Sequence, residues 1–313
     1  MSSELCSTGK LRNTNSKSIT PWAIAMYTSF YGFRERPFSL LPDPEFLFLS
    51  KEHSVALAVL EYALSGGIGC SVVTGEIGCG KTTLVRQLLN DSSEELTIGL
   101  ISNTHRSFGE LLDWVSMAFD LEIMGKRKAE LYHNFVNFLV QQYAVGKRTV
   151  LIVDEAQNMD AQTLEELRLL SNVNADKDQV LQLVLVGQPE LRDTLRRPDL
   201  VQMAQRVGVN YHLAPLLPEE VPTYIAHRLQ TAGGDLGLFT VDACTLVAHH
   251  SGGVPRIINT LCDTALVFGY ATEQPGVDAN LVAEVIRDTA RNSLLSVVSG
   301  DLDVLLTSRK SHS

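Results

Sequence analysis

The chain has 313 residues, of which 45% are hydrophobic and 20% are charged, so it is long enough for two domains or for one large domain with an appendage. Its formal net charge of −10 argues against non-specific binding to nucleic acid. The five cysteines are an odd number without C-x-x-C spacing, which indicates reduced thiols of a cytosolic protein. No uncharged run reaches the roughly 20 mainly apolar residues of a membrane span, so we expect no transmembrane segment.

The first patterned stretch follows a polar beginning. Residues 1–25 are rich in Ser, Thr, Asn and Lys without hydrophobic periodicity, which predicts a disordered N-terminal extension. Residues 27–48 are rich in aromatic residues and proline, which predicts an ordered, largely non-helical segment packed on a core. Apolar residues then recur at helical spacing over residues 53–64.

Apolar runs typical of strands alternate with helical patterns through the middle of the chain. The expected strands cover residues 70–74, 96–101, 150–153, 181–186 and 207–213. The expected helices between them cover residues 81–90, 108–119, 131–143 and 161–170. This alternation predicts an α/β sandwich, in which a parallel sheet carries helices on both faces.

After Pro215 the strand pattern stops. Helical patterns over residues 218–230, 241–250, 255–270 and 278–292 predict a small all-helical domain. We therefore divide the chain into an extension (1–25), an α/β core (26–216), a helical domain (217–292) and a C-terminal tail (293–313).

The stretch from Gly75 to Thr82 fits the pattern G-x-x-x-x-G-K-[ST]. It follows an expected strand and opens an expected helix, the context in which this pattern binds phosphate rather than forming an ordinary glycine-rich turn. We expect Lys81 to reach the β- and γ-phosphates and the hydroxyl of Thr82 to bind Mg²⁺. The residues expected to contact the nucleotide are Gly75, Glu76, Ile77, Gly78, Cys79, Gly80, Lys81, Thr82 and Thr83. We also expect one or two aromatic rings of residues 27–48 to border a bound adenine.

An acidic pair ends the apolar run at residues 150–153. A buried strand that ends there delivers Asp154 beside the phosphate loop, where its carboxylate can hold Mg²⁺. Glu155 can then orient and polarise the attacking water as a general base. The alternative is an ordinary acidic pair at a helix start, which the upstream phosphate loop disfavours.

Three further polar residues are candidates for contact with the γ-phosphate. Gln188 follows the strand at 181–186, although it also fits a simple turn residue. Arg256 opens a helix of the helical domain and can reach the γ-phosphate if the domains close. Arg206 precedes the last strand, and Arg196 and Arg197 compete with it; for each arginine the alternative is a solvated surface residue.

Taken together, these motifs resemble the AAA+ ATPases, and more narrowly the general secretion pathway protein A (ExeA-like) family with its relatives in pilus and exopolysaccharide export clusters. The resemblance covers about residues 26–290. Cys79 stands where the family often has threonine, and a small residue still fits there. The shared stretches are MYxxFYG from Met26, PF from Pro37, PDPxFLF from Pro42, TGE from Thr74, VDEAQ from Val153, GQPEL from Gly187 and SGGVPR from Ser251.

The resemblance implies a P-loop core followed by a helical lid, and an enzyme that hydrolyses ATP with Mg²⁺. It also implies that Gln188 and Arg256 sense the γ-phosphate, and that Arg206 is given in trans to the next subunit of a homo-oligomer. The expected partner is a protein of an envelope export or pilus system, and the expected location is cytoplasmic, peripheral at the inner membrane through that partner. Two alternatives stay open, a DNA-acting ATPase such as a transposition regulator and a nucleotide-dependent switch with slow turnover. The net charge disfavours the first, and the intact Asp154-Glu155 pair disfavours the second.

Overall fold

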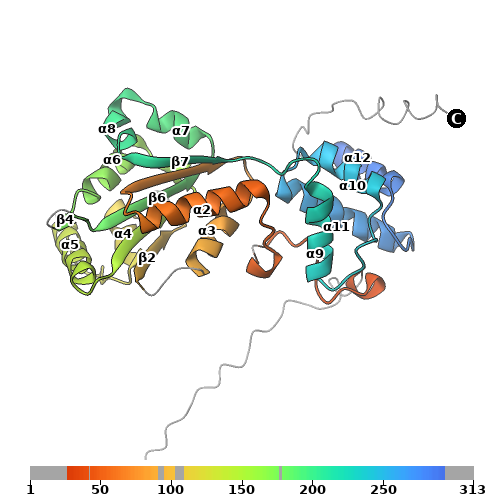
Figure 1. Ribbon diagram of the computed structural model, residues 1–313, viewed down its shortest axis with the longest axis horizontal. Coiled ribbons are helices and arrows are strands. Elements are labelled where there is room, and N and C mark those ends of the chain that lie inside the picture. The colour runs from red at the N-terminus through yellow and green to blue at the C-terminus, as the bar shows by residue number, and fades with distance from the viewer. Residues whose placement is uncertain (1–26, 42, 91–94, 103–108, 176–177, 293–313) are drawn as a thin grey trace, which may run out of the picture.

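The computed structural model describes residues 27–41, 43–90, 95–102, 109–175 and 178–292. Figure 1 shows a body built on a sheet beside a body built from the C-terminal helices. The five sheet strands are parallel and lie in the order β2–β3–β6–β1–β7. Their bounds are β1 (Cys70–Gly75), β2 (Leu96–Ile101), β3 (Arg148–Val153), β6 (Leu181–Gly187) and β7 (Val207–Leu213).

Helices cover both faces of this sheet, as the alternating pattern predicted. One face packs in a buried cluster with α2 (Lys51–Ser65) and α3 (Lys81–Asn90). The other face packs with α4 (Leu111–Ala118), α5 (Lys128–Ala144) and α6 (Ala161–Leu170). The central strands β1 and β6 are buried along their whole length. Their unbroken apolar runs follow from this double cover, because neither face of a covered parallel sheet meets water.

The order of the strands brings three strand ends together. β1 lies between β6 and β7, and β3 pairs with the other edge of β6. All strands run in one direction, so the carboxyl ends of β1, β3 and β6 meet at one edge of the sheet. Ligands of open parallel sheets bind at this edge.

Several short elements escaped the sequence patterns. They are a two-stranded hairpin of β4 (Asn174–Ala175) and β5 (Asp178–Gln179), the helices α7 (Glu190–Leu195) and α8 (Val201–Ala204), and the 3₁₀ turns η1 (Pro44–Phe46), η3 (Ala156–Asn158) and η4 (Pro198–Leu200). Each is too short to show a period. The starts of two longer helices were also misplaced, because a hydrogen bond from the N-cap backbone fixes each one. The N–H of Glu110 donates to Asp113 Oδ2 at 2.9 Å, and α4 starts later than expected. The N–H of Arg127 donates to Glu130 Oε2 at 2.7 Å, and α5 starts earlier.

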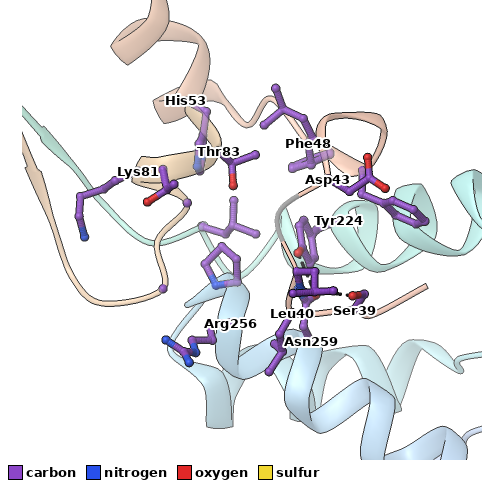
Figure 2. A pocket seen from close by; sticks show the side chains of 18 of the residues that line it. Ser39, Leu40, Asp43, Phe48, His53, Lys81, Thr83, Tyr224, Arg256 and Asn259 are labelled. Carbon is purple, nitrogen blue, oxygen red and sulfur yellow. Dashed lines mark hydrogen bonds between the residues drawn. The ribbon is translucent and has the colours of Figure 1, made fainter. Parts of the chain in front are cut away.

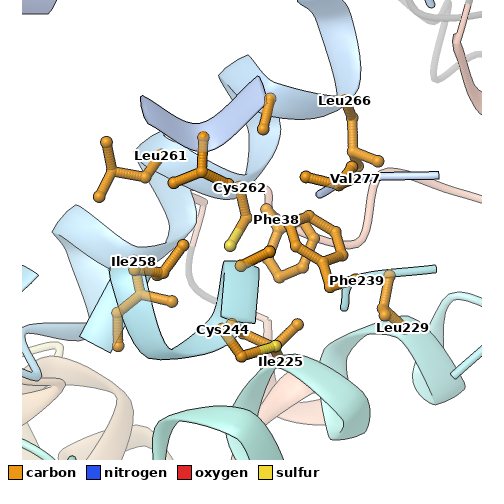
Figure 3. Packing of buried hydrophobic residues seen from close by; sticks show 14 of the residues in the cluster. Phe38, Ile225, Leu229, Phe239, Cys244, Ile258, Leu261, Cys262, Leu266 and Val277 are labelled. Atoms are coloured by element: carbon orange, nitrogen blue, oxygen red, sulfur yellow. The ribbon is translucent and has the colours of Figure 1, made fainter. Parts of the chain in front are cut away.

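The second body contains α9 (Val221–Thr231), α10 (Val241–Ser251), α11 (Pro255–Ala271) and α12 (Ala279–Asn292), close to the four predicted helices. Their apolar faces form one buried cluster (Figure 3). Among the described residues, no helix is long and apolar enough to cross a membrane. The extension (1–25) and the tail (293–313) lie outside the described residues. The predicted domain boundaries near 25, 216 and 292 stay predictions.

The aromatic segment packs on the C-terminal helices rather than on the sheet that follows it in the chain. Tyr27, Phe33, Phe38 and Phe46 belong to the helical cluster, and Figure 3 shows Phe38 among side chains of that cluster. The segment is helical at residues 27–31 and at η1 and otherwise irregular, largely as predicted.

Buried arginine contacts fasten this segment to α9. The Nε of Arg228 donates to the carbonyl oxygen of Pro37 at 2.6 Å, and its Nη2 donates to that of Ser39 at 3.0 Å. The guanidinium carbon also lies 4.5 Å from the centre of the Phe46 ring. An ion pair of 2.5 Å between Arg36 and Asp263 links the segment to α11 as well. The segment therefore belongs to the helical body, although it precedes the sheet in the chain.

Candidate functional site

The loop between β1 and α3 has the backbone that its glycines permit. Gly78 has φ +85° and Gly80 has φ +94°, in the left-handed region where a residue without Cβ is unstrained. Between them, the Cys79 side chain is fully buried, and burial raises the pKa of its thiol. His53 supports the loop from α2. Its Nε2 lies 3.0 Å from the carbonyl oxygen of Cys79, and its Nδ1 lies 2.7 Å from Ser50 Oγ.

Lys81 holds its ammonium group inside the loop. Its side chain is 7% exposed, and its Nζ donates to the carbonyl oxygens of Gly75 at 2.7 Å and Glu76 at 2.8 Å. Burial lowers the pKa of Lys81, and the nearby carboxylates of Glu155 and Asp154 oppose that shift. An anionic phosphate is a stronger partner for this ammonium group than neutral carbonyls are. The loop therefore fits a phosphate group.

The hydroxyl of Thr82 and the carboxylate of Asp154 meet across the loop. Thr82 Oγ1 donates to Asp154 Oδ2 at 2.8 Å, and Asp154 is 5% exposed. A hydroxyl and a carboxylate are hard oxygen donors of the kind Mg²⁺ takes beside substrate phosphates. These two residues fit the predicted Mg²⁺ site.

Glu155 turns out of the sheet in an unusual backbone conformation. Its φ of 54° and ψ of 35° are left-handed, and its N–H donates to Asp154 Oδ1 at 2.9 Å. Its carboxylate accepts a hydrogen bond of 2.5 Å from Gln157 Nε2. The Oε1 of Gln157 in turn accepts from the backbone N–H of Gln188 at 3.0 Å. The structure thus links Glu155 and Gln188 through a residue that the sequence reasoning left without a role.

A cavity of about 310 Å³ opens between the loop and the helical body (Figure 2). The predicted residues that line it are Ile77, Gly78, Gly80, Lys81, Thr82, Thr83, Glu155, Gln188 and Arg256. The opposite wall was largely missed. It comes from the aromatic segment, α2 and the C-terminal helices, and includes Ser39, Leu40, Leu41, Asp43, Phe46, Leu47, Phe48, His53, Leu216, Tyr224, Arg228, Pro255 and Asn259. Phe46 and Phe48 of the aromatic segment lie in this wall. The high proportion of aromatic residues in this segment was the one feature of the sequence that pointed to the wall.

Arg256 lies against the loop at the start of α11. Its backbone N–H donates to the carbonyl oxygen of Gly78 at 3.2 Å, and Figure 2 shows its side chain below the loop. A Cβ at Gly78 would lie 2.5 Å from the Cβ of Arg256. The helical body therefore touches the phosphate loop directly.

Arg206 lies at the opposite end of the sheet from the loop of its own chain. It directly precedes Val207, which pairs with Cys70 at the start of β1. Its Nη1 donates to Ser171 Oγ at 2.9 Å, and its Nη2 donates to Asn172 Oδ1. The competing Arg196 and Arg197 form exposed ion pairs with Asp193 and Asp199. None of the three arginines lines the cavity.

Comparisons with known proteins show which sequences are similar to this chain. The family model of the AAA domain matches residues 65–195. General secretion pathway protein A of Aeromonas hydrophila is 42% identical over 247 residues, which are 79% of this chain and 45% of that protein. The chain thus spans less than half the length of this relative.

Two solved structures share the fold. The ORC2 protein of Aeropyrum pernix, in its ADPNP–ADP complexes, has a TM-score of 0.62 at 18% identity, and the alignment covers 82% of this chain and 72% of the ORC2 chain. Domain III of the replication initiation protein DnaA of Thermotoga maritima has a TM-score of 0.54 at 22% identity, and the alignment covers 80% of this chain and 98% of the DnaA chain. At these identities the likeness shows the fold alone.

A phosphate loop on a five-stranded parallel sheet, followed by a helical body that closes the site, defines a P-loop NTPase of the AAA+ class. The chain is therefore an AAA+ ATPase by fold and motifs, and over 79% of its length it is similar to general secretion pathway protein A.

Proposed function

We propose that this protein binds ATP together with Mg²⁺ and hydrolyses it to ADP and phosphate. The observation that carries the proposal is that Lys81, Thr82 and Glu155 line one cavity, while Asp154 accepts a hydrogen bond from Thr82 behind it. These residues supply a cation for the phosphates, oxygen ligands for a metal and a carboxylate for the water.

The roles follow from the chemistry of each group. Lys81 exchanges its bonds to the loop carbonyls for bonds to the β- and γ-phosphates. Thr82 and Asp154 hold the Mg²⁺, which supplies positive charge against the phosphate oxygens. Glu155 accepts a proton from water as the water oxygen bonds to the γ-phosphorus. The bond between the γ-phosphorus and the β–γ bridging oxygen breaks, and that oxygen leaves with ADP.

Gln188 and Arg256 are proposed to contact the γ-phosphate from two different bodies. Gln188 lies at the end of β6 and Arg256 at the start of α11, and both line the cavity. Cleavage of the γ-phosphate removes charge from between them. The position of the helical body relative to the sheet then depends on the nucleotide, which is how hydrolysis can drive a partner.

We further propose that the protein works as a homo-oligomer on a protein partner of a bacterial envelope export, pilus or exopolysaccharide system. It would act in the cytoplasm, peripherally at the inner membrane through that partner. The 42% identity to general secretion pathway protein A supports this role. An oligomer also supplies a neighbour for Arg206, which lies away from its own cavity.

The test of the enzymatic proposal is phosphate release from ATP and GTP, together with binding of a fluorescent ATP analogue. The wild type should hydrolyse ATP, and Glu155→Gln should bind the analogue but turn over at least about 10²-fold more slowly. Glu61→Gln, an exposed position on α2, is the matched control and should keep wild-type turnover. Loss of binding in Glu155→Gln would contradict its role as the base.

The biological role needs a separate measurement. The genes beside this one are identified first; turnover is then measured with any secretin, pilin or exopolysaccharide-export protein that they encode and, in parallel, with duplex DNA. Stimulation by the protein alone supports the proposed role. Stimulation by DNA alone would replace it with the DNA-acting alternative, and turnover too slow to measure would favour the nucleotide-dependent switch.

A further inference from the structure

We propose that Gln157 is a positioning residue, which orients the carboxylate of Glu155 for proton transfer and ties it to the strand end that carries Gln188. The inference rests on the proposed hydrolysis and goes beyond it, because neither the phosphate-loop pattern nor the acidic pair assigns Gln157 a function.

Both ends of the Gln157 amide are engaged. Its Nε2 donates to Glu155 Oε2 at 2.5 Å, and its Oε1 accepts from the backbone N–H of Gln188 at 3.0 Å. A carboxylate accepts only and a backbone N–H donates only, so a single orientation of the amide satisfies both contacts. Gln157 therefore holds Glu155 and Gln188 in a fixed relation.

The backbone around Glu155 gives this contact its importance. A left-handed conformation is strained for a residue with a Cβ, so surrounding contacts must maintain it at Glu155. The 3₁₀ turn η3 begins directly after Glu155 and brings the side chain of Gln157 back onto it. Glu155 has two freely rotating methylene groups, and a bond to one carboxylate oxygen limits where the carboxylate lies.

Gly187 leaves room for the amide. A Cβ at this position would lie 2.9 Å from Gln157 Oε1, 3.0 Å from Leu191 Cδ2 and 3.2 Å from the backbone N of Gln157. A contact under 3.0 Å forces a shift, which the end of the Gln157 side chain can make, so Gly187 lets the amide keep its present place beside this strand. A displacement of this strand end on contact with the γ-phosphate would reach Glu155 through the same amide.

Three variants test the proposal from different sides. Gln157→Ala removes both contacts. Gln157→Glu keeps the acceptor for the Gln188 N–H and replaces the donor to Glu155 with a like charge. Gly187→Ala displaces the amide and changes neither Glu155 nor Gln188. Gln141→Ala, an exposed position on α5, is the matched control.

The expected result is a separation of kcat from KM. We expect kcat to fall by about 10- to 100-fold in the three variants, since a misplaced catalytic group costs up to about 10²-fold, while KM for ATP stays within about twofold. Gln141→Ala should keep the wild-type values. In single-turnover assays, Gln157→Ala should slow a Glu155→Gln protein no further, because both changes remove the same function.

The outcomes separate this inference from the proposed function. If Glu155→Gln is slow but Gln157→Ala and Gln157→Glu keep wild-type kcat, the positioning role is overturned and the hydrolysis stands. An equal, additive loss in the Glu155→Gln background overturns it too, since that result indicates a purely structural effect. If the wild type hydrolyses no nucleotide, the proposed function is overturned and this inference with it.

Discussion

The backbone N–H of Arg256 donates a hydrogen bond to the carbonyl oxygen of Gly78 at 3.2 Å. One residue opens α11 of the helical body, and the other lies in the phosphate loop of the sheet body. They are far apart in sequence, yet the space between them leaves no room for a Cβ at Gly78. The contact therefore joins the helical body directly to the phosphate loop.

Gly78→Ala tests this contact. The substitution combines a left-handed φ of +85° with a Cβ 2.5 Å from that of Arg256. We expect a loss of about 1–2 kcal/mol of stability from the backbone. We also expect at least about tenfold weaker ATP binding, equivalent to 1.4 kcal/mol, from the displaced α11. Thermal denaturation and titration with a fluorescent ATP analogue measure the two effects.

Gly146 supplies the matched control for that experiment. Its φ is +78°, but a Cβ there would meet nothing within 4 Å. Gly146→Ala should therefore show the loss of stability without the loss of binding. Equal binding by the two variants would show that the Gly78–Arg256 contact does not shape the site.

Lys81→Ala should abolish ATP turnover and leave the fold intact. The ammonium of Lys81 is the cation placed inside the loop, where it donates to the backbone carbonyl oxygens of Gly75 and Glu76. Circular dichroism checks the fold, and phosphate release checks turnover. Wild-type kcat in Lys81→Ala would refute the phosphate-loop assignment.

His53→Gln should flatten the pH dependence of stability on the acid side. Burial lowers the pKa of His53 below its ordinary value of 6.5, against the opposing effect of its contact with Cys79 and of Glu220 and Glu52. Between the lowered pKa of the folded state and the ordinary pKa of the unfolded chain, the unfolded chain binds more protons. The free energy of unfolding therefore falls as the pH is lowered through this range. The contribution is at most about 1.4 kcal/mol per pH unit.

The measurement is the free energy of unfolding in urea between pH 7.5 and pH 5. The wild-type slope should shrink in His53→Gln without vanishing, because burial also lowers the pKa of His227 and His250. An unchanged slope would show that His53 does not titrate differently in the folded state.

Arg206→Ala should bind ATP normally and hydrolyse it slowly, with the defect confined to the assembled state. A guanidinium delivered to the γ-phosphate contributes about 10³-fold or more to the rate. Arg206 lies at the far end of its own sheet, so the γ-phosphate it serves would belong to a neighbour. Turnover is measured against protein concentration and compared with the oligomeric state.

Mixing two inactive variants separates a trans role from a structural one. In a mixed assembly, a subunit with intact Glu155 can receive Arg206 from a Glu155→Gln neighbour, which neither variant alone permits. An excess of Arg206→Ala protein should therefore restore part of the activity. No rescue in demonstrably mixed assemblies would remove Arg206 from this role and direct attention to Arg196 or Arg197.

Local sequence patterns were sufficient for the elements and for the chemical groups. The strand over residues 207–213 and the helices over residues 81–90 and 161–170 were predicted with the bounds observed, because apolar periodicity records which side of each element is buried. The phosphate loop was readable for a similar reason. Its backbone requires glycines, and its chemistry requires Lys81 and Thr82, at a fixed local spacing.

Tertiary structure alone decided how these groups meet. The order of the strands brings Gln188 beside Glu155, and the packing of the aromatic segment on α9 and α11 builds the second wall of the cavity. The tertiary structure also decided the hydrogen bonds of Gln157 to Glu155 and Gln188, and the contact of Gly78 with Arg256. Periodicity tells which face of an element is buried but not which distant element covers it. Hydrogen bonds between groups far apart in the chain form only after that packing is fixed.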